Sequence, residues 1–128
     1  MKIAEVSEQY GISSDTLRYY ERIGLIPPVN RNKSGIRDYN DTDVKRVEFI
    51  KCMRSAGLPI EELIEYVALV QQGDTTIEAR KDILKEQREL LMVRMKEMQK
   101  TLDILDYKIR VYENAVLKKE KELIPIED

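Results

Sequence analysis

Apolar and polar residues divide the chain into a compact part followed by a long part. Ile3, Val6 and Tyr10 recur at helical spacing, and Gly11 ends that segment. Ser13 can begin the next helix, because its hydroxyl can accept a hydrogen bond from a free backbone N–H group. Two short helices joined by so tight a glycine turn are typical of a helix-turn-helix motif.

The second helix, which begins at Ser13, has two different faces. At about 100° per residue, Leu17, Tyr20 and Ile23 share a face that we expect to pack in a core. The other face carries Arg and Tyr side chains, and Arg can reach guanine edges or phosphate while Tyr can donate to phosphate. This pattern predicts a recognition helix for the major groove. Its outward residues are Asp15, Arg18, Tyr19 and Arg22.

A hairpin is predicted after this helix. Pro27 and Pro28 prevent the helix from continuing, and apolar residues flank an Asn-Lys-Ser-Gly turn at residues 32–35. A basic hairpin beside a recognition helix is typical of a wing that grips the phosphate backbone. Its basic side chains are Arg31, Lys33 and Arg37.

Two further helices follow the wing. The first is expected over about residues 41–56, capped by Asn40 or Asp41, with Gly57 after it. The second is expected over about residues 59–72. Pro59 supplies a fixed φ for its first turn but no capping hydroxyl.

The long part contains a seven-residue repeat. Two interleaved apolar series form a 3–4 seam over about four heptads, the signature of a coiled coil. One helix of about 40 residues spans roughly 60 Å, and nothing else in the chain is long enough to cover the seam. The sequence therefore predicts a homodimer. The seam residues are Leu91, Met95, Met98, Leu102, Leu105, Ile109, Tyr112 and Val116.

Composition limits the protein class. Its 128 residues include one Cys and no His, which excludes an intrachain disulfide and removes the usual zinc and copper ligand sets. We expect no metal site and no cofactor. No apolar run approaches the roughly 20 residues of a membrane span, and the start is too polar for a signal peptide. A cytoplasmic protein without a membrane partner is expected.

Charge is unevenly distributed along the chain, although the net charge is only −2. Residues 1–58 hold ten Lys and Arg against eight Asp and Glu, whereas residues 59–128 hold twelve against sixteen. The modest basic excess therefore coincides with the predicted helix-turn-helix and wing, as expected for a nucleic-acid-binding half. The predicted domains are a DNA-binding domain at 1–74, a coiled-coil helix at 75–118 and a tail at 119–128.

Three stretches resemble one family. The stretches "IAEVSEQYGISSDTLRYYERIGLIPP", "SGIRDY" and "AGLPIEELIEY", followed by a coiled-coil helix, are similar to the MerR family of bacterial transcription regulators. The run "TLRYYERIGL" with a following R-x-Y is highly specific. The resemblance implies a mainly α fold, a winged helix-turn-helix domain joined to an antiparallel coiled-coil dimer.

The resemblance also implies which residues contact operator DNA. The recognition helix would contribute Thr16, Arg18, Tyr19 and Arg22. The wing would contribute Arg31, Lys33, Ser34, Gly35, Arg37 and Tyr39. The start of the third helix would bring Lys45 and Arg46 near the DNA.

Cys52 is the predicted sensor. Metal-sensing members of the family carry cysteines at the end of the long helix, and this chain has none there. The run "DVKRVEFIKCMRSAGL" resembles single-cysteine members that respond to aldehydes or other electrophiles. Judged from the residues alone, the neighbours of Cys52 in the sequence do not make its thiol more reactive. The alternative to a sensor is a small buried hydrophobic residue between two helices.

The predicted function is transcription regulation and not catalysis. By resemblance, the protein would activate genes by distorting promoter DNA, with promoter duplex, RNA polymerase and a second copy as partners. The alternative is an architectural DNA binder with the same winged fold, no sensing, and Cys52 in the core. We expect no enzyme, because no phosphate-binding loop and no nucleophile–base pair are visible.

Overall fold

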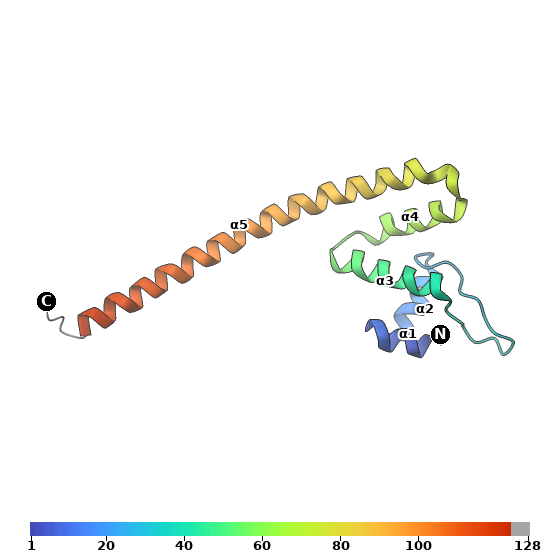
Figure 1. The fold of residues 1–128 in the computed structure, drawn as a ribbon, viewed down its shortest axis with the longest axis horizontal. Helices are drawn as coiled ribbons and strands as arrows, with labels where there is room; N and C mark the ends of the chain where they lie inside the picture. Colours follow the sequence, from blue (N-terminus) through green and yellow to red (C-terminus); the bar gives the residue numbers. More distant parts are fainter. Residues whose placement is uncertain (124–128) are drawn as a thin grey trace. The chain divides into compact units, whose positions relative to one another are not determined.

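The computed structural model describes residues 1–123, and the side chains of residues 1–119. Its elements are all helical, and the described residues form no strand. The order is α1 (Ile3–Tyr10), α2 (Ser14–Arg22), α3 (Asp41–Ser55), α4 (Ile60–Gln72), the 3-10 turn η1 (Asp74–Thr76) and α5 (Ile77–Leu123) (Figure 1). The expected mainly α fold with a long C-terminal helix is confirmed.

Helices α1 and α2 meet at a tight turn, as the sequence predicts. Gly11 ends α1 with φ +66°, a left-handed conformation that other residues adopt at a cost. The Ser13 hydroxyl caps α2 by accepting a hydrogen bond from the Thr16 N–H at 3.1 Å. Contacts of α1 with both α2 and α3 place the helix-turn-helix against the third helix.

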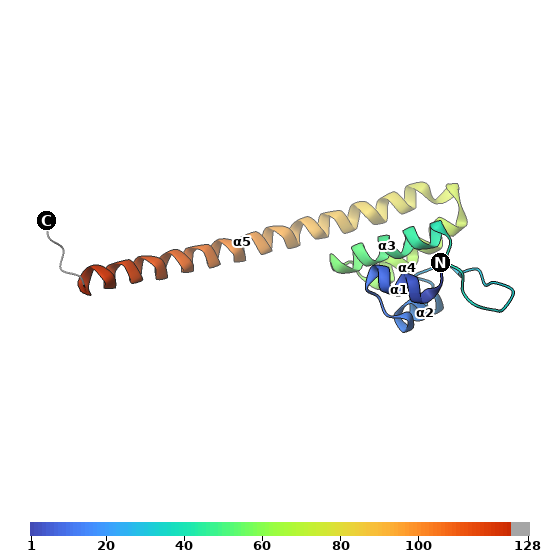
Figure 2. The same ribbon diagram turned by 60° about the horizontal axis from the view of Figure 1, so that its bottom comes forward.

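The segment between α2 and α3 forms the wing. The predicted hairpin is present in minimal form, because a single antiparallel bridge joins Arg31 to Arg37. The Asn32 side chain accepts from the N–H groups of Ser34 and Ile36, at 2.9 and 3.0 Å, and these bonds close the tip. In Figures 1 and 2 this loop projects beyond the neighbouring helices.

Helices α3 and α4 lie within a residue of their predicted bounds. Asn40 is the cap of α3, since its side chain accepts from the Asp43 N–H at 2.8 Å. Pro59 is the N-cap of α4 and makes no side-chain cap bond. The missing hydroxyl was expected from the sequence.

Two apolar clusters hold these helices together. The first joins α1, α2, the wing and α3 through Val6, Leu17, Ile26, Val29, Tyr39 and Val47. The second joins the segment after α2 to α3 and α4 through Leu25, Ile50, Leu58, Leu63 and Val67. Tyr20 is half-buried and packs against both clusters. Each fully buried aliphatic side chain contributes roughly 1.5–3 kcal/mol, so these clusters fix the position of α2 and the wing base.

The chain divides into a unit spanning Met1–Gln87 and a second unit from Arg88 onward. The first unit extends past the predicted boundary at residue 74 because η1 contacts α4 and Arg80 of α5 donates to the Gly73 carbonyl at the end of α4. The Thr76 hydroxyl donates to the carbonyls of Leu69 and Gly73, and Gln87 is buried.

Helix α5 also continues to Leu123, beyond the predicted end at 118. The predicted tail at 119–128 therefore begins inside the helix. Its part beyond residue 123 lies outside the described residues. None of the helices within residues 1–123 is both long and apolar enough to cross a membrane.

Candidate nucleic-acid interface

The outward face of α2 carries an exposed group of Arg and Tyr side chains. Arg18 is 48% exposed and pairs with Asp15 at 2.8 Å, and the Arg22 guanidinium lies 5.2 Å from the centre of the exposed Tyr19 ring. An exposed pair such as Arg18–Asp15 is worth at most about 1 kcal/mol, so a phosphate or a guanine edge can replace Asp15. Thr16 is half-buried.

The wing tip presents the predicted contacts to solvent. Lys33, Ser34 and Gly35 are exposed. Arg31 is also exposed, and its Nη1 donates to the Gly35 carbonyl at 2.8 Å. That bond orders the arginine across the turn, and Gly35 permits the turn with φ +79°. The tip therefore offers two cations, Arg31 and Lys33, to an anionic partner.

Arg37 joins the wing to α2. Its Nε donates to the Glu21 carboxylate at 3.0 Å, and the two side chains are only 19% and 17% exposed. The recognition helix and the wing base are therefore tied together by a partly buried ion pair. Sequence reasoning missed Glu21, which is one of two acidic residues that α2 carries beside its two arginines.

Tyr39 requires a correction. Its side chain is 2% exposed and belongs to the first apolar cluster, so it has almost no surface to offer DNA. No hydrogen-bond partner among the described residues reaches its buried hydroxyl. Burial, reinforced by the nearby Glu21 carboxylate, raises the pKa of Tyr39 above its ordinary value of 10.0. Its role is to anchor the wing in the core.

Lys45 and Arg46 lie on α3 but differ in exposure. Lys45 is exposed, whereas Arg46 is half-buried. The Arg46 Nη1 atom is buried, and no acceptor within the described part of the chain reaches it. Both residues line a cavity on the side of α3 that faces α4 and the start of α5.

Cys52 is exposed on the last turns of α3. The alternative expectation, that Cys52 is a core residue, is wrong for the chain as described, because the core positions on this helix are Val47 and Ile50. The thiol is therefore accessible to a small electrophile.

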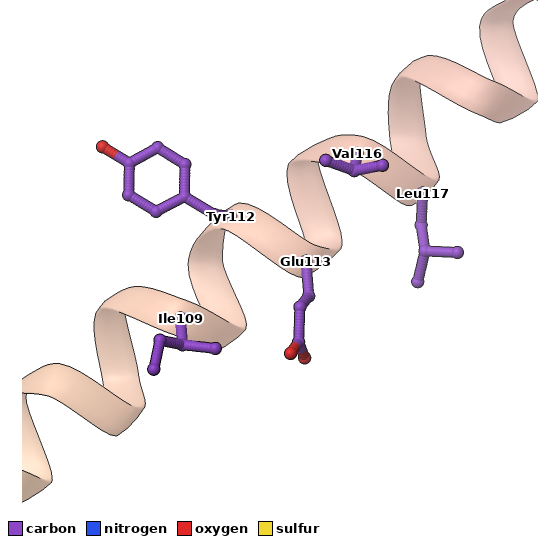
Figure 3. A pocket seen from close by; sticks show the side chains of 5 residues that line it. All are labelled: Ile109, Tyr112, Glu113, Val116 and Leu117. Atoms are coloured by element: carbon purple, nitrogen blue, oxygen red, sulfur yellow. The ribbon is translucent and has the colours of Figure 1, made fainter.

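The seam residues of α5 are exposed in the single chain. From Met95 to Val116 their exposed fractions range from 49% to 71%, and Leu91 is half-buried. Ile109, Tyr112 and Val116 line a hollow of about 580 Å³ together with Glu113 and Leu117 (Figure 3). This hollow is part of the seam and not a separate site, because three of its five lining residues are seam positions.

Two family models match the chain. Residues 1–70 match the MerR HTH family regulatory protein model, and residues 44–107 match the model described as MerR, DNA binding. The fold and the exposed face of α2 define a helix-turn-helix DNA-binding regulator, and the chain belongs to the MerR family.

Individual relatives agree with this assignment. Over 92 residues the chain is 61% identical to the HTH-type transcriptional regulator AdhR of Bacillus subtilis, a match that covers 72% of this chain and 66% of that protein. A MerR family transcriptional regulator from Listeria monocytogenes has a similar structure, with a TM-score of 0.91 and 49% identity over 96% of this chain and 93% of that one.

A relative bound to DNA is also similar. HiNmlR, described as a MerR family regulator lacking the sensor domain and bound to promoter DNA, has a TM-score of 0.82. Its identity is 30%, over 91% of this chain and 92% of that chain. The chain is accordingly a DNA-binding transcription regulator and not an enzyme.

Proposed function

We propose that the chain binds promoter DNA as a homodimer and activates transcription by changing DNA shape. The observation that carries the DNA-binding part is the exposed Arg18, Tyr19 and Arg22 face of α2, tied to the wing by the Arg37–Glu21 pair. A helix inserted in the major groove and a wing beside it contact both the edges of the bases and the phosphates of the backbone. Base edges give sequence preference, and phosphates give affinity that depends on salt.

The homodimer is proposed from α5. Within residues 88–123, the described part of the second unit, this helix has no other element to pack against, and seven of its eight seam residues are exposed. Burying such residues contributes roughly 25 cal/mol per Å² of apolar surface. A second copy carries an identical seam, so an antiparallel pair of helices covers both seams at once.

Activation by distortion follows from two recognition helices held at a fixed separation. Bending or untwisting a site of this length costs of order 1–6 kcal/mol, which contacts from both DNA-binding units can offset. We propose that the distortion brings promoter elements into the alignment that RNA polymerase requires. The regulator then stays bound in both the silent and the active state.

Cys52 is proposed as the sensor of aldehydes or other electrophiles. The support is its exposure on α3 and the resemblance of the surrounding sequence to single-cysteine regulators. The sulfur would add to the aldehyde carbon while the carbonyl oxygen takes up a proton, which gives a hemithioacetal. Position 52 lies between the wing and α4 in the chain, so an added group there can shift the DNA-binding unit.

Footprinting tests the activation mechanism. The operator is first selected from random duplexes, and protection is then measured with and without formaldehyde. We expect full protection in both states, together with new hypersensitive positions after treatment. If formaldehyde removes the protein from DNA while transcription rises, the protein is an ordinary repressor and the distortion mechanism is wrong.

Replacement of the thiol tests the sensor. Cys52→Ser should retain operator affinity and lose the transcriptional response to formaldehyde, whereas Ser55→Ala on the same helix should keep both. A full transcriptional response to formaldehyde in Cys52→Ser would show that Cys52 is not the sensor. Loss of the response from both variants would indicate damage to α3 and not removal of the thiol.

A further inference from the structure

A small cavity lies where α3, α4 and the start of α5 meet, inside the first unit. Its volume is about 260 Å³. Thr42, Lys45, Arg46 and Phe49 of α3 line it at spacings of three and four residues, so they share one helix face. Tyr66 of α4 and Arg80 of α5 lie across from them.

The lining of this cavity is cationic. Three of its side chains, Lys45, Arg46 and Arg80, carry positive charge, and no residue of the lining is acidic. Arg46 Nη1 and Arg80 Nε are buried, and no acceptor among the described residues reaches either atom. Leaving a buried donor without an acceptor costs about 1–3 kcal/mol. The cavity therefore favours a ligand that supplies anionic oxygens.

One of the two guanidinium groups is already fixed in place. Arg80 Nη2 donates to the Gly73 carbonyl at 3.1 Å, at the end of α4. An ordered guanidinium loses less conformational freedom when it binds an oxyanion, and its planar fork suits carboxylate and phosphate oxygens. Arg80 lies outside every set of residues that the sequence indicated as functional.

Two aromatic rings form the apolar part of the cavity. The centres of the Phe49 and Tyr66 rings lie 5.6 Å apart, with the ring planes inclined at 34°. Flat aromatic surfaces beside cationic groups suit a ligand that joins a planar apolar part to a negative charge.

We propose that this cavity binds a small organic anion, most simply an aromatic carboxylate. The ligand's oxygens would accept hydrogen bonds from Arg46 and Arg80, and its ring would lie against Phe49 and Tyr66. This site goes beyond the proposed function, because it uses neither Cys52 nor the exposed face of α2. A bound anion would contact α3, α4 and the first turns of α5 together.

The probe for this site is benzoate, titrated into the full chain and observed by NMR. We expect saturable shifts of the Phe49 and Tyr66 ring signals with benzoate, weaker shifts with inorganic phosphate, and none with neutral benzamide. Benzamide matches benzoate in shape, so it separates the effect of the charge from that of the ring.

Substitutions assign the binding to the cavity. Arg46→Gln and Arg80→Gln should each weaken benzoate binding about tenfold or more, the loss expected when a charged hydrogen bond is removed. Lys51→Gln removes the same charge from an exposed position of α3 outside the cavity lining and should change nothing. If Arg80→Gln fails to fold because it loses the Gly73 bond, Arg46→Gln decides alone.

Three results would overturn the proposal. One is the absence of saturable benzoate binding to the folded protein. Another is unchanged benzoate affinity in Arg46→Gln. The third is competitive displacement of benzoate by a short duplex of random sequence, which would make the cavity a contact for DNA phosphate.

Discussion

The two units of the chain differ in how far their apolar side chains are exposed to solvent. In the first unit Val6, Leu17 and Ile50 are fully buried, and polar side chains cap the helices around them. In the second unit Met98 and Tyr112 are 69% and 71% exposed. The first unit is stabilised by its own packing, whereas the second has a complete seam that no other described element of that unit covers. Exposed apolar residues at heptad spacing therefore indicate an interface with another chain.

Breaking the seam should have the largest effect. Leu102→Lys with Leu105→Lys places two cations in the middle of the seam, so we expect monomers in sedimentation velocity runs. Operator affinity should fall by about 100-fold or more, because the second DNA contact is no longer intramolecular.

The matched control for the seam variant is Ile104→Lys with Val111→Lys. These two residues are also exposed, at 61% and 43%, but neither belongs to the seam series. The control should stay dimeric. A seam variant that remains dimeric, or a control that dissociates as readily, would mean that the repeat does not define the interface.

The recognition helix gives the next largest effect. Arg18→Ala should cost about 1–3 kcal/mol of discrimination, which is roughly 5- to 150-fold between the preferred base and its competitors. Fluorescence anisotropy on the selected operator and its single-base variants measures this ratio. Lys51→Ala, which removes a charge from α3, serves as the control. If Arg18→Ala weakens binding to all duplexes equally, Arg18 contacts phosphate and not a base edge.

The wing pair separates a phosphate contact from a positioning contact. Arg37→Ala should weaken binding to every sequence and lower the salt slope by about one unit, since one cation near phosphate is lost. Glu21→Gln breaks the same ion pair but keeps the arginine, so it should weaken binding without lowering the slope. Equal slopes in wild type and Arg37→Ala would leave Arg37 only the role of holding the wing on α2.

Tyr39 should give the smallest effect and one that depends on pH. Its pKa is raised in the folded state, so its contribution to stability is complete below the unfolded value of 10.0 and is lost as pH rises through the folded value. Tyr39→Phe should be as stable as wild type or more so near neutral pH, because no described residue forms a hydrogen bond with the hydroxyl. Thermal melts between pH 7 and pH 11 should show a smaller alkaline loss in the variant, whereas identical losses would contradict this account.

The helices and their caps could be predicted from the sequence, because the interactions that form them join residues only a few positions apart. Gly11, Ser13 and Asn40 act through backbone groups three or four positions away, and each takes the role that its type favours. Pro27 and Pro28, which prevent a helix from continuing, likewise lie between α2 and the wing. The seam was visible for the same reason, since a seven-residue repeat is a property of one continuous helix.

Contacts between distant segments were not predictable in this way. Arg37 and Tyr39 both looked like wing residues that face DNA, yet one pairs with Glu21 and the other lies in the core. Arg80 and Arg46 line the same cavity although 34 positions separate them in the sequence, and no local pattern predicts that cavity. The extent of the first unit, to Gln87, also depends on the contacts that η1 and the start of α5 make with the end of α4.

The number of chains on one operator tests the central claim most directly. Light scattering on the complex between the full chain and its selected operator gives the mass of the bound species. We predict two chains for each duplex at saturation, and two chains in the free protein as well, because the proposed dimer buries the seam of α5 against a second copy. One chain on each saturated duplex, with the free protein a monomer, would contradict the account.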